Sequence, residues 1–67
     1  MRLTKPNIKK VIEDNFGSYI DIELVGIKKS GDVFTALSKP QGINAEITQS
    51  PEWEDNLITH IKWQLNI

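Results

Sequence analysis

The sequence contains no cysteine and only one histidine among its 67 residues. Disulfides and zinc–thiolate sites are therefore excluded, and a single imidazole makes no metal site unless several carboxylates converge on it. We predict no metal and no cofactor. A domain of this size buries only about 60% of the surface that its unfolded chain exposes. Its stability must therefore come from good packing or from association with another chain.

Neither sign of charge dominates, because eight basic and nine acidic residues give a net charge of −1. Typical nucleic-acid-binding domains are strongly basic, so this balance argues against that class. No apolar run approaches the ~20 residues of a membrane helix, and residues 1–12 lack the apolar stretch of a signal peptide. We expect a single compact domain, residues 1–67, in the cytoplasm and without membrane contact. A short chain with many Ile, Lys and Asn residues would suit a phage or mobile-element protein.

The segment from Tyr19 to Leu37 has the pattern of a β-hairpin. Apolar and polar residues alternate in its first half, which places Ile20, Ile22 and Leu24 on one buried face. Ser30-Gly31 supplies the positive φ that a tight turn requires.

The facing of the second strand is open from sequence alone. Either Phe34 and Ala36 point to the core or Val33 and Leu37 do, and the larger apolar area of Phe34 favours the first choice. Gly26 in the first strand indicates a bulge.

The first helix is predicted to begin at Thr4, a good N-cap, with Pro6 in its first turn. Gly17 suits the left-handed position after its end. Its apolar residues follow the spacing of one helical face: Ile8, Val11, Ile12 and Phe16.

The second helix is predicted to start with Ser50 as cap and Pro51 at the first helical position, followed by three carboxylates near the positive end of the dipole. His60 lies at the edge of its apolar arc, where a half-buried packing role is the usual one. The arc itself contains Trp53, Leu57, Ile58, Ile61 and Leu65.

A turn at residues 39–42 and a third strand containing Ile43, Ala45 and Ile47 complete the pattern. The predicted fold is α+β in the order α-β-β-β-α, with a three-stranded antiparallel meander and two helices packed on one face. The opposite face would show polar residues to solvent: Asp21, Glu23, Asn44, Glu46 and Thr48.

This order and length resemble those of the double-stranded-RNA-binding fold, which implies a nucleic-acid-binding alternative. In that family, lysines at the start of the second helix meet phosphates, whereas residues 50–55 here are acidic. The alternative would rest on a basic N-terminal helix and hairpin turn, with phosphate contacts from Arg2, Lys5, Lys9, Lys10, Lys28 and Lys29.

Catalysis finds little support in the sequence, and we predict a protein that is not an enzyme. Asp21 and Glu23 share a strand face in the predicted hairpin, so a carboxylate dyad is geometrically allowed, but a solvated sheet face is the more common reason for such a pair. The glycines are isolated and form no phosphate-binding loop.

Trp63 is the feature that core packing does not explain. It projects about 160° from the centre of the apolar arc, and Trp is enriched at binding hot spots. The alternative is that the loop before the helix, or the amino-terminal segment, folds over it. We therefore predict a protein-interaction module (a regulatory, inhibitory or accessory protein) that binds another protein or a second copy of itself through the exposed side of the C-terminal helix. The binding residues would be Trp63, Thr59, Asn56, Asp55 and Glu52.

Overall fold

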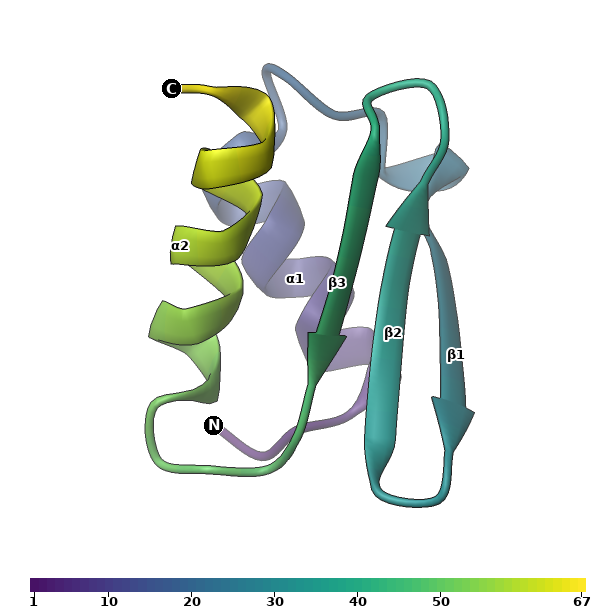
Figure 1. Cartoon of the computed structure of the whole chain (residues 1–67), viewed down its shortest axis with the longest axis vertical. Helices are drawn as coiled ribbons and strands as arrows, with labels where there is room; N and C mark the ends of the chain where they lie inside the picture. The colour runs from purple at the N-terminus through teal and green to yellow at the C-terminus, as the bar shows by residue number, and fades with distance from the viewer.

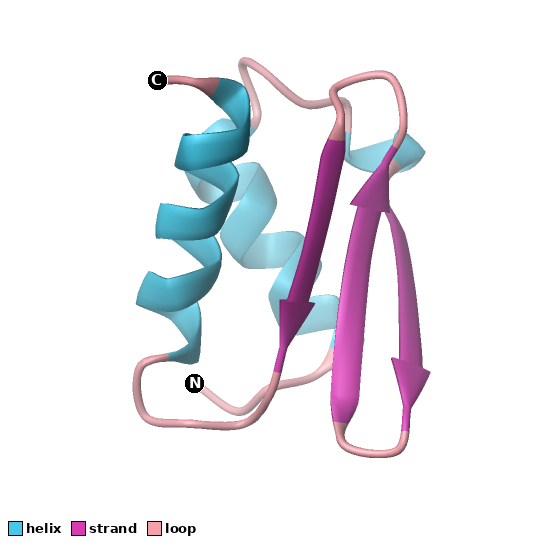
Figure 2. Cartoon of the chain, in the orientation of Figure 1, coloured by secondary structure: helices cyan, strands magenta, loops and turns pink.

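The computed structural model describes residues 1–67 and contains two helices and three strands. The elements are α1 (Lys5–Phe16), a short 3₁₀ turn η1 (Ile22–Leu24), β1 (Gly26–Ser30), β2 (Val33–Ser38), β3 (Ile43–Ile47) and α2 (Trp53–Leu65). The strands pair antiparallel in the order β1-β2-β3 (Figure 1). Figure 2 shows α1 and α2 on the same side of this sheet. The predicted α-β-β-β-α meander is therefore confirmed.

One core of 15 apolar side chains joins both helices to a single face of the sheet. Phe34 and Ala36 of β2 point into it, so the predicted facing of this strand is correct. Leu57 and Ile61 of α2 are fully buried, as expected. The alternate residues of β2 are half-buried on the opposite face. That face is therefore not covered by either helix.

The first strand is shorter than predicted. The hairpin was expected to start at Tyr19, but β1 begins only at Gly26, which pairs with Leu37 near the end of β2. A strand can extend no further than its neighbour supplies hydrogen bonds, and β2 has only six residues. The preceding segment turns back on itself instead, because an Asp21 carboxylate oxygen accepts a hydrogen bond of 3.1 Å from the Glu23 backbone N–H.

This change moves several side chains from their predicted positions. Ile20 is buried, but Ile22 is half-buried and Leu24 is exposed. Val25 takes a place in the core instead. Because Asp21 and Glu23 lie outside the sheet, they do not belong to its open face, whose polar residues include Lys28 of β1, Asn44 and Glu46.

The two tight turns follow the sequence closely. Gly31 has φ +61 and is the first of the two residues between Ser30 and Val33, the position that a type II′ hairpin reserves for Gly. The Gly42 N–H donates to the Lys39 carbonyl across the second turn at 3.1 Å, as predicted. Gly26, in contrast, pairs in regular register, so the predicted bulge is wrong.

The helix ends were predicted less well. Thr4 does cap α1, because its hydroxyl accepts a hydrogen bond from the Asn7 N–H at 3.2 Å. Gly17 is right-handed rather than left-handed, and glycine is needed there because a Cβ would lie 2.7 Å from the Glu13 carbonyl oxygen. Ser50 does not cap α2, which begins at Trp53 after a turn at residues 51–52 and has no side-chain cap.

Candidate protein-interaction surface on the C-terminal helix

The buried side of α2 determines which of its residues face solvent. Trp53, Leu57 and Ile61 recur every four residues and point into the core. At about 100° per residue, this row leaves the opposite side of the helix outside. Trp63 lies there with 84% of its surface exposed, more than any other large apolar side chain in the protein.

The side chains around Trp63 are polar and exposed. We call the set of Glu52, Asp55, Asn56, Thr59 and Trp63 the α2 outer face, and the structure exposes every member. A shallow depression of about 330 Å³ runs along it, lined by Asn56, Thr59, His60 and Trp63. The indole therefore stands at the border of a surface hollow. No segment of this chain covers it.

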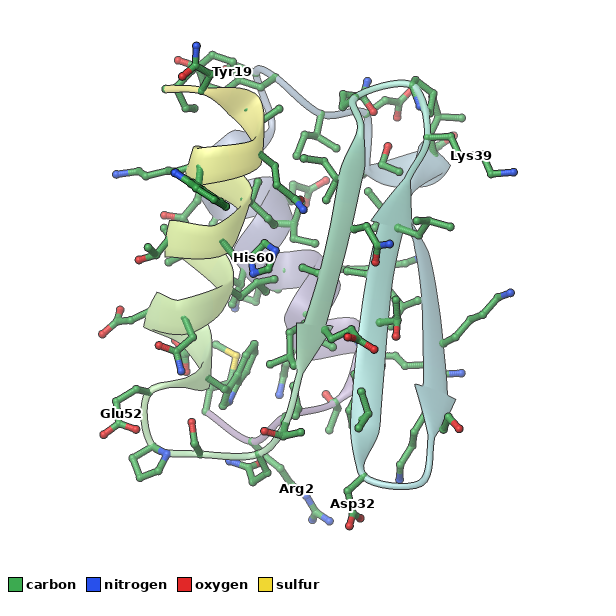
Figure 3. All side chains as sticks on the ribbon, in the orientation of Figure 1. Arg2, Tyr19, Asp32, Lys39, Glu52 and His60 are labelled. Carbon is green, nitrogen blue, oxygen red and sulfur yellow. The ribbon has the colours of Figure 1, made fainter.

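His60 is exposed rather than half-buried, so the packing role expected for it is wrong. Figure 3 shows the ring between α2 and the sheet. His60 also lines a second, smaller hollow of about 120 Å³ between α2 and β3, together with Glu46 and Thr48. The two hollows share His60 and Asn56, so the α2 outer face continues toward the edge of the sheet.

Two sets of long-range contacts hold α2 in place. At its C-terminal end, Gln64 uses both ends of its amide on the backbone of Asn44: its oxygen accepts from the Asn44 N–H at 3.0 Å, and its nitrogen donates to the Asn44 carbonyl at 2.8 Å. These two bonds give partners to the Asn44 N–H and carbonyl at the edge of β3, where no strand lies alongside. The helix is thereby fixed against the sheet next to the exposed Trp63.

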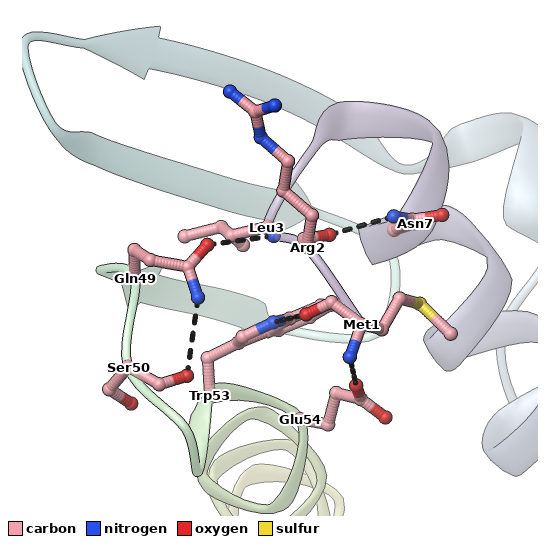
Figure 4. Close-up of polar contacts among 8 residues, drawn as sticks. All are labelled: Met1, Arg2, Leu3, Asn7, Gln49, Ser50, Trp53 and Glu54. Carbon is pink, nitrogen blue, oxygen red and sulfur yellow. Dashed lines mark hydrogen bonds and ion pairs between the residues drawn. The ribbon is translucent and has the colours of Figure 1, made fainter.

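At the other end of α2, the amino-terminal segment lies across Trp53 (Figure 4). The Trp53 indole N–H donates to the Met1 carbonyl at 2.7 Å, and the Glu54 carboxylate lies 3.2 Å from the amino group of Met1. Gln49 accepts a hydrogen bond from the Leu3 N–H at 2.9 Å. The segment that could have covered Trp63 therefore covers Trp53, which is 1% exposed.

The basic residues of the alternative site do not share one face. Lys28 and Lys29 are neighbours on β1, so their side chains point to opposite sides of the sheet. The Lys29 Nζ atom lies 5.4 Å from the centre of the Phe34 ring. Together with Arg2 it lines a depression of about 610 Å³, which also contains Asp32. Figure 3 shows Arg2 and Asp32 at the same end of the molecule. The remaining lysines, Lys5, Lys9 and Lys10, are exposed on α1.

Asp21 and Glu23 do not lie on a common strand face, as the predicted hairpin required for a carboxylate dyad. Asp21 accepts a hydrogen bond from the backbone of Glu23, and both residues belong to the turn before β1 rather than to the sheet. The geometry for a dyad on a strand face is therefore lost. No group of three or more His, Asp and Glu side chains lies close enough together to hold a metal ion.

Sequence reasoning missed one apolar hollow on the uncovered side of the sheet. It measures about 320 Å³ and is lined by Leu24, Gly26, Leu37, Lys39 and Pro40. Leu24 was assigned to the core of a longer strand, which concealed this hollow. Asp21 and Gly26 are residue types that often interrupt strands. Had they been used to place a turn at residues 21–25, Leu24 would have been predicted outside the core, beside this hollow.

Comparison of the chain with protein-family models, with curated proteins and with solved structures found no match. Neither helix has the length and apolar character needed to span a membrane.

Proposed function

We propose that the protein is a small non-enzymatic interaction module that binds another polypeptide through the α2 outer face. The observation that carries this proposal is the 84% exposure of Trp63 on a helix whose other tryptophan is buried. A large indole on the surface leaves apolar area in contact with water, and burying it in a complex is favourable. Trp is also among the residue types most enriched at binding hot spots.

The attachment of α2 to the rest of the chain at both of its ends supports the same proposal. Gln64 fixes its C-terminal end to β3, and Trp53 fixes its first turn to the amino-terminal segment. A surface on a fixed element loses little conformational freedom when it binds, so less of the interaction energy is spent on ordering. The outer face is thus suited to shape-specific recognition.

The test is a Trp63→Ala variant compared with the native protein. We expect the variant to keep the native circular dichroism spectrum and melting temperature, because the indole makes little contact with its own chain. We expect it to lose binding, since truncating a hot-spot Trp can cost about 2 kcal/mol or more. Binding is measured as self-association and as capture of a partner on immobilised protein.

Leu24→Ala is a matched control, because Leu24 is also an exposed apolar residue but borders the hollow on the uncovered side of the sheet. It should leave binding unchanged. Unfolding of Trp63→Ala would place Trp63 in the fold rather than in an interface. Equal loss of binding in both variants would contradict a site on α2.

The alternative function, nucleic-acid binding, has one observation in its favour. Arg2 and Lys29 lie around the same depression, so two positive charges from distant parts of the chain meet there. Asp32 lines the same hollow and reduces its positive potential. The interaction module therefore remains our first proposal.

A further inference from the structure

The α2 outer face contains both halves of a helix–helix contact. Trp63 projects from it as a single large side chain. One to three turns earlier lie four exposed residues at positions i, i+3, i+4 and i+7, the first at the N-cap and the others within α2: Glu52, Asp55, Asn56 and Thr59. Four residues with this spacing form the hole into which a side chain of a facing helix inserts. The same helix thus carries a knob and, on the same side, a hole of suitable spacing.

From this arrangement we infer that the partner of the α2 outer face is a second copy of the chain, bound by antiparallel pairing of the two α2 helices. The inference rests on the proposed function. In such a pair, each Trp63 inserts into the four-residue hole of the other copy. The midpoint between Trp63 and the centre of the hole falls at Thr59. A two-fold axis at Thr59 therefore makes both insertions at once, as an isologous dimer requires.

The charged residues along one side of the α2 outer face are also complementary about this two-fold axis. Asp55 and Lys62 are exposed, and on a helical wheel both lie roughly 80–100° to one side of Trp63. A two-fold axis perpendicular to the helices reverses their direction but keeps this flank on the same side. It therefore brings Asp55 of each copy to Lys62 of the other. The midpoint of these two residues lies between Ile58 and Thr59, within about 1.5 Å of the axis defined by Trp63.

A parallel arrangement lacks this match, because a two-fold axis along the helices places the flanks that carry Asp55 and Lys62 on opposite sides of the contact. The antiparallel arrangement also offers the Trp63 indole N–H a hydrogen-bond acceptor. A buried Trp N–H needs an acceptor, and Glu52, Asp55 and Asn56 in the hole of the other copy all offer side-chain oxygens. Spacing, charge and hydrogen bonding are thus self-complementary about one axis. A foreign helix would need to reproduce all three features.

The experiment is sedimentation equilibrium of the full chain, from about 10 µM to about 1 mM, a range that covers weak dimers. We expect a monomer–dimer equilibrium. Trp63→Ala should raise the dimer dissociation constant by well over about 30-fold, because that factor corresponds to one hot spot and each dimer loses two. Trp63 emission should shift to shorter wavelength as the concentration of protein increases, while Trp53, which is already buried, contributes a constant signal.

Charge exchange tests the direction of the pairing. Asp55→Lys and Lys62→Glu, each alone, should weaken the dimer about tenfold or more, because each replaces two attractive pairs by two repulsive ones. The double variant should restore the native dissociation constant within about threefold. Both residues are exposed, so circular dichroism should show all three variants folded.

A native protein that stays monomeric at about 1 mM would overturn the inference. So would a dimer that is insensitive to Trp63→Ala, or a double charge variant that remains as weak as the single ones. The first of these results leaves the proposed function standing if Trp63→Ala still abolishes binding to a different protein. If the native protein is monomeric and its binding to other proteins is also unaffected by Trp63→Ala, both the dimer and the proposed function fail.

Discussion

At the scale of single residues, the two tryptophans of α2 show how little of a side chain's environment depends on its type. Trp53 is 1% exposed and Trp63 is 84% exposed on the same helix. Trp53 lies at the start of the row that points into the core, and its N–H has an acceptor in the Met1 carbonyl. Trp63 lies outside this row. Only contact with another molecule can bury it.

Ile61 is a sensitive position in α2, because its side chain is 0% exposed and belongs to the core. Ile61→Ala should lower the free energy of unfolding by about 2–5 kcal/mol through lost burial and a cavity. Urea denaturation followed by circular dichroism measures this change. Lys62→Ala, the exposed neighbour, should change stability by less than about 0.5 kcal/mol. Equal effects of the two substitutions would contradict the assigned facing of the helix.

Thr4 offers a test of a local contact at the start of α1. Its hydroxyl accepts the Asn7 N–H, which otherwise has no partner within the helix. Thr4→Ala should therefore reduce the free energy of unfolding by about 1 kcal/mol, and Thr4→Ser should largely preserve it. Thermal denaturation of both variants gives the comparison. A Thr4→Ser variant as unstable as Thr4→Ala would show that the methyl group, rather than the cap, is responsible.

At the scale of elements, the Gln64 side chain joins α2 to β3 by bonding the strand backbone as a neighbouring strand would. In an antiparallel pair, alternate residues direct their backbone groups away from the partner strand. Asn44 does so at the outer edge of β3, where Gln64 binds both its N–H and its carbonyl. An uncovered edge can pair with another chain. The α2 helix therefore both fills the core and closes part of the sheet edge.

Gln64→Ala should remove this closure and leave the rest of the fold intact. We expect a loss of about 1 kcal/mol of stability from two exposed hydrogen bonds. The more specific result is faster hydrogen exchange of the Asn44 amide, measured by NMR, while amides in the centre of β2 keep their protection. Thr59→Ala on the same helix is the control, and it should leave the Asn44 amide unchanged. Unaltered Asn44 exchange in Gln64→Ala would show that the bonds do not persist in solution.

At the scale of the whole molecule, charge is dispersed. The net charge is −1, and Lys28 and Lys29 point to opposite sides of the sheet. The first turn of α2 is acidic, with Glu54 and Asp55. A phosphate backbone needs several cations along one continuous path. The molecule does not provide such a path with all six basic residues of the alternative site.

We therefore expect only weak, non-specific binding to RNA or DNA at physiological salt. The dissociation constant should be weaker than about 10⁻⁶ M, and affinity should fall further as salt increases. Fluorescence anisotropy with labelled single- and double-stranded oligonucleotides measures both quantities. Arg2→Ala combined with Lys29→Ala should remove most of whatever binding is found, because these residues line one depression. A sub-micromolar, salt-resistant complex would favour the alternative function.

The sequence alone determined the elements whose signals are local. A repeat of about 3.6 residues defined α1 and α2, and alternation defined β3. Gly31 and the turn at residues 39–42 determined the connections, since only a few residues can adopt those backbone angles. The outward direction of Trp63 also followed from the sequence, because the helical repeat that buries Leu57 and Ile61 places Trp63 on the other side. Its exposure did not follow, because the amino-terminal segment could have covered it and the structure places that segment over Trp53 instead.

Only the tertiary structure decided the features that depend on distant neighbours. The start of β1 at Gly26 depends on the length of β2, which no local pattern in β1 records. The same is true of the Met1 carbonyl beneath the Trp53 indole and of Gln64 on the Asn44 backbone, where the contacting residues are 52 and 20 positions apart. Periodicity reports which side of an element is apolar. It does not report which backbone group lies opposite, because that depends on how the elements pack in three dimensions.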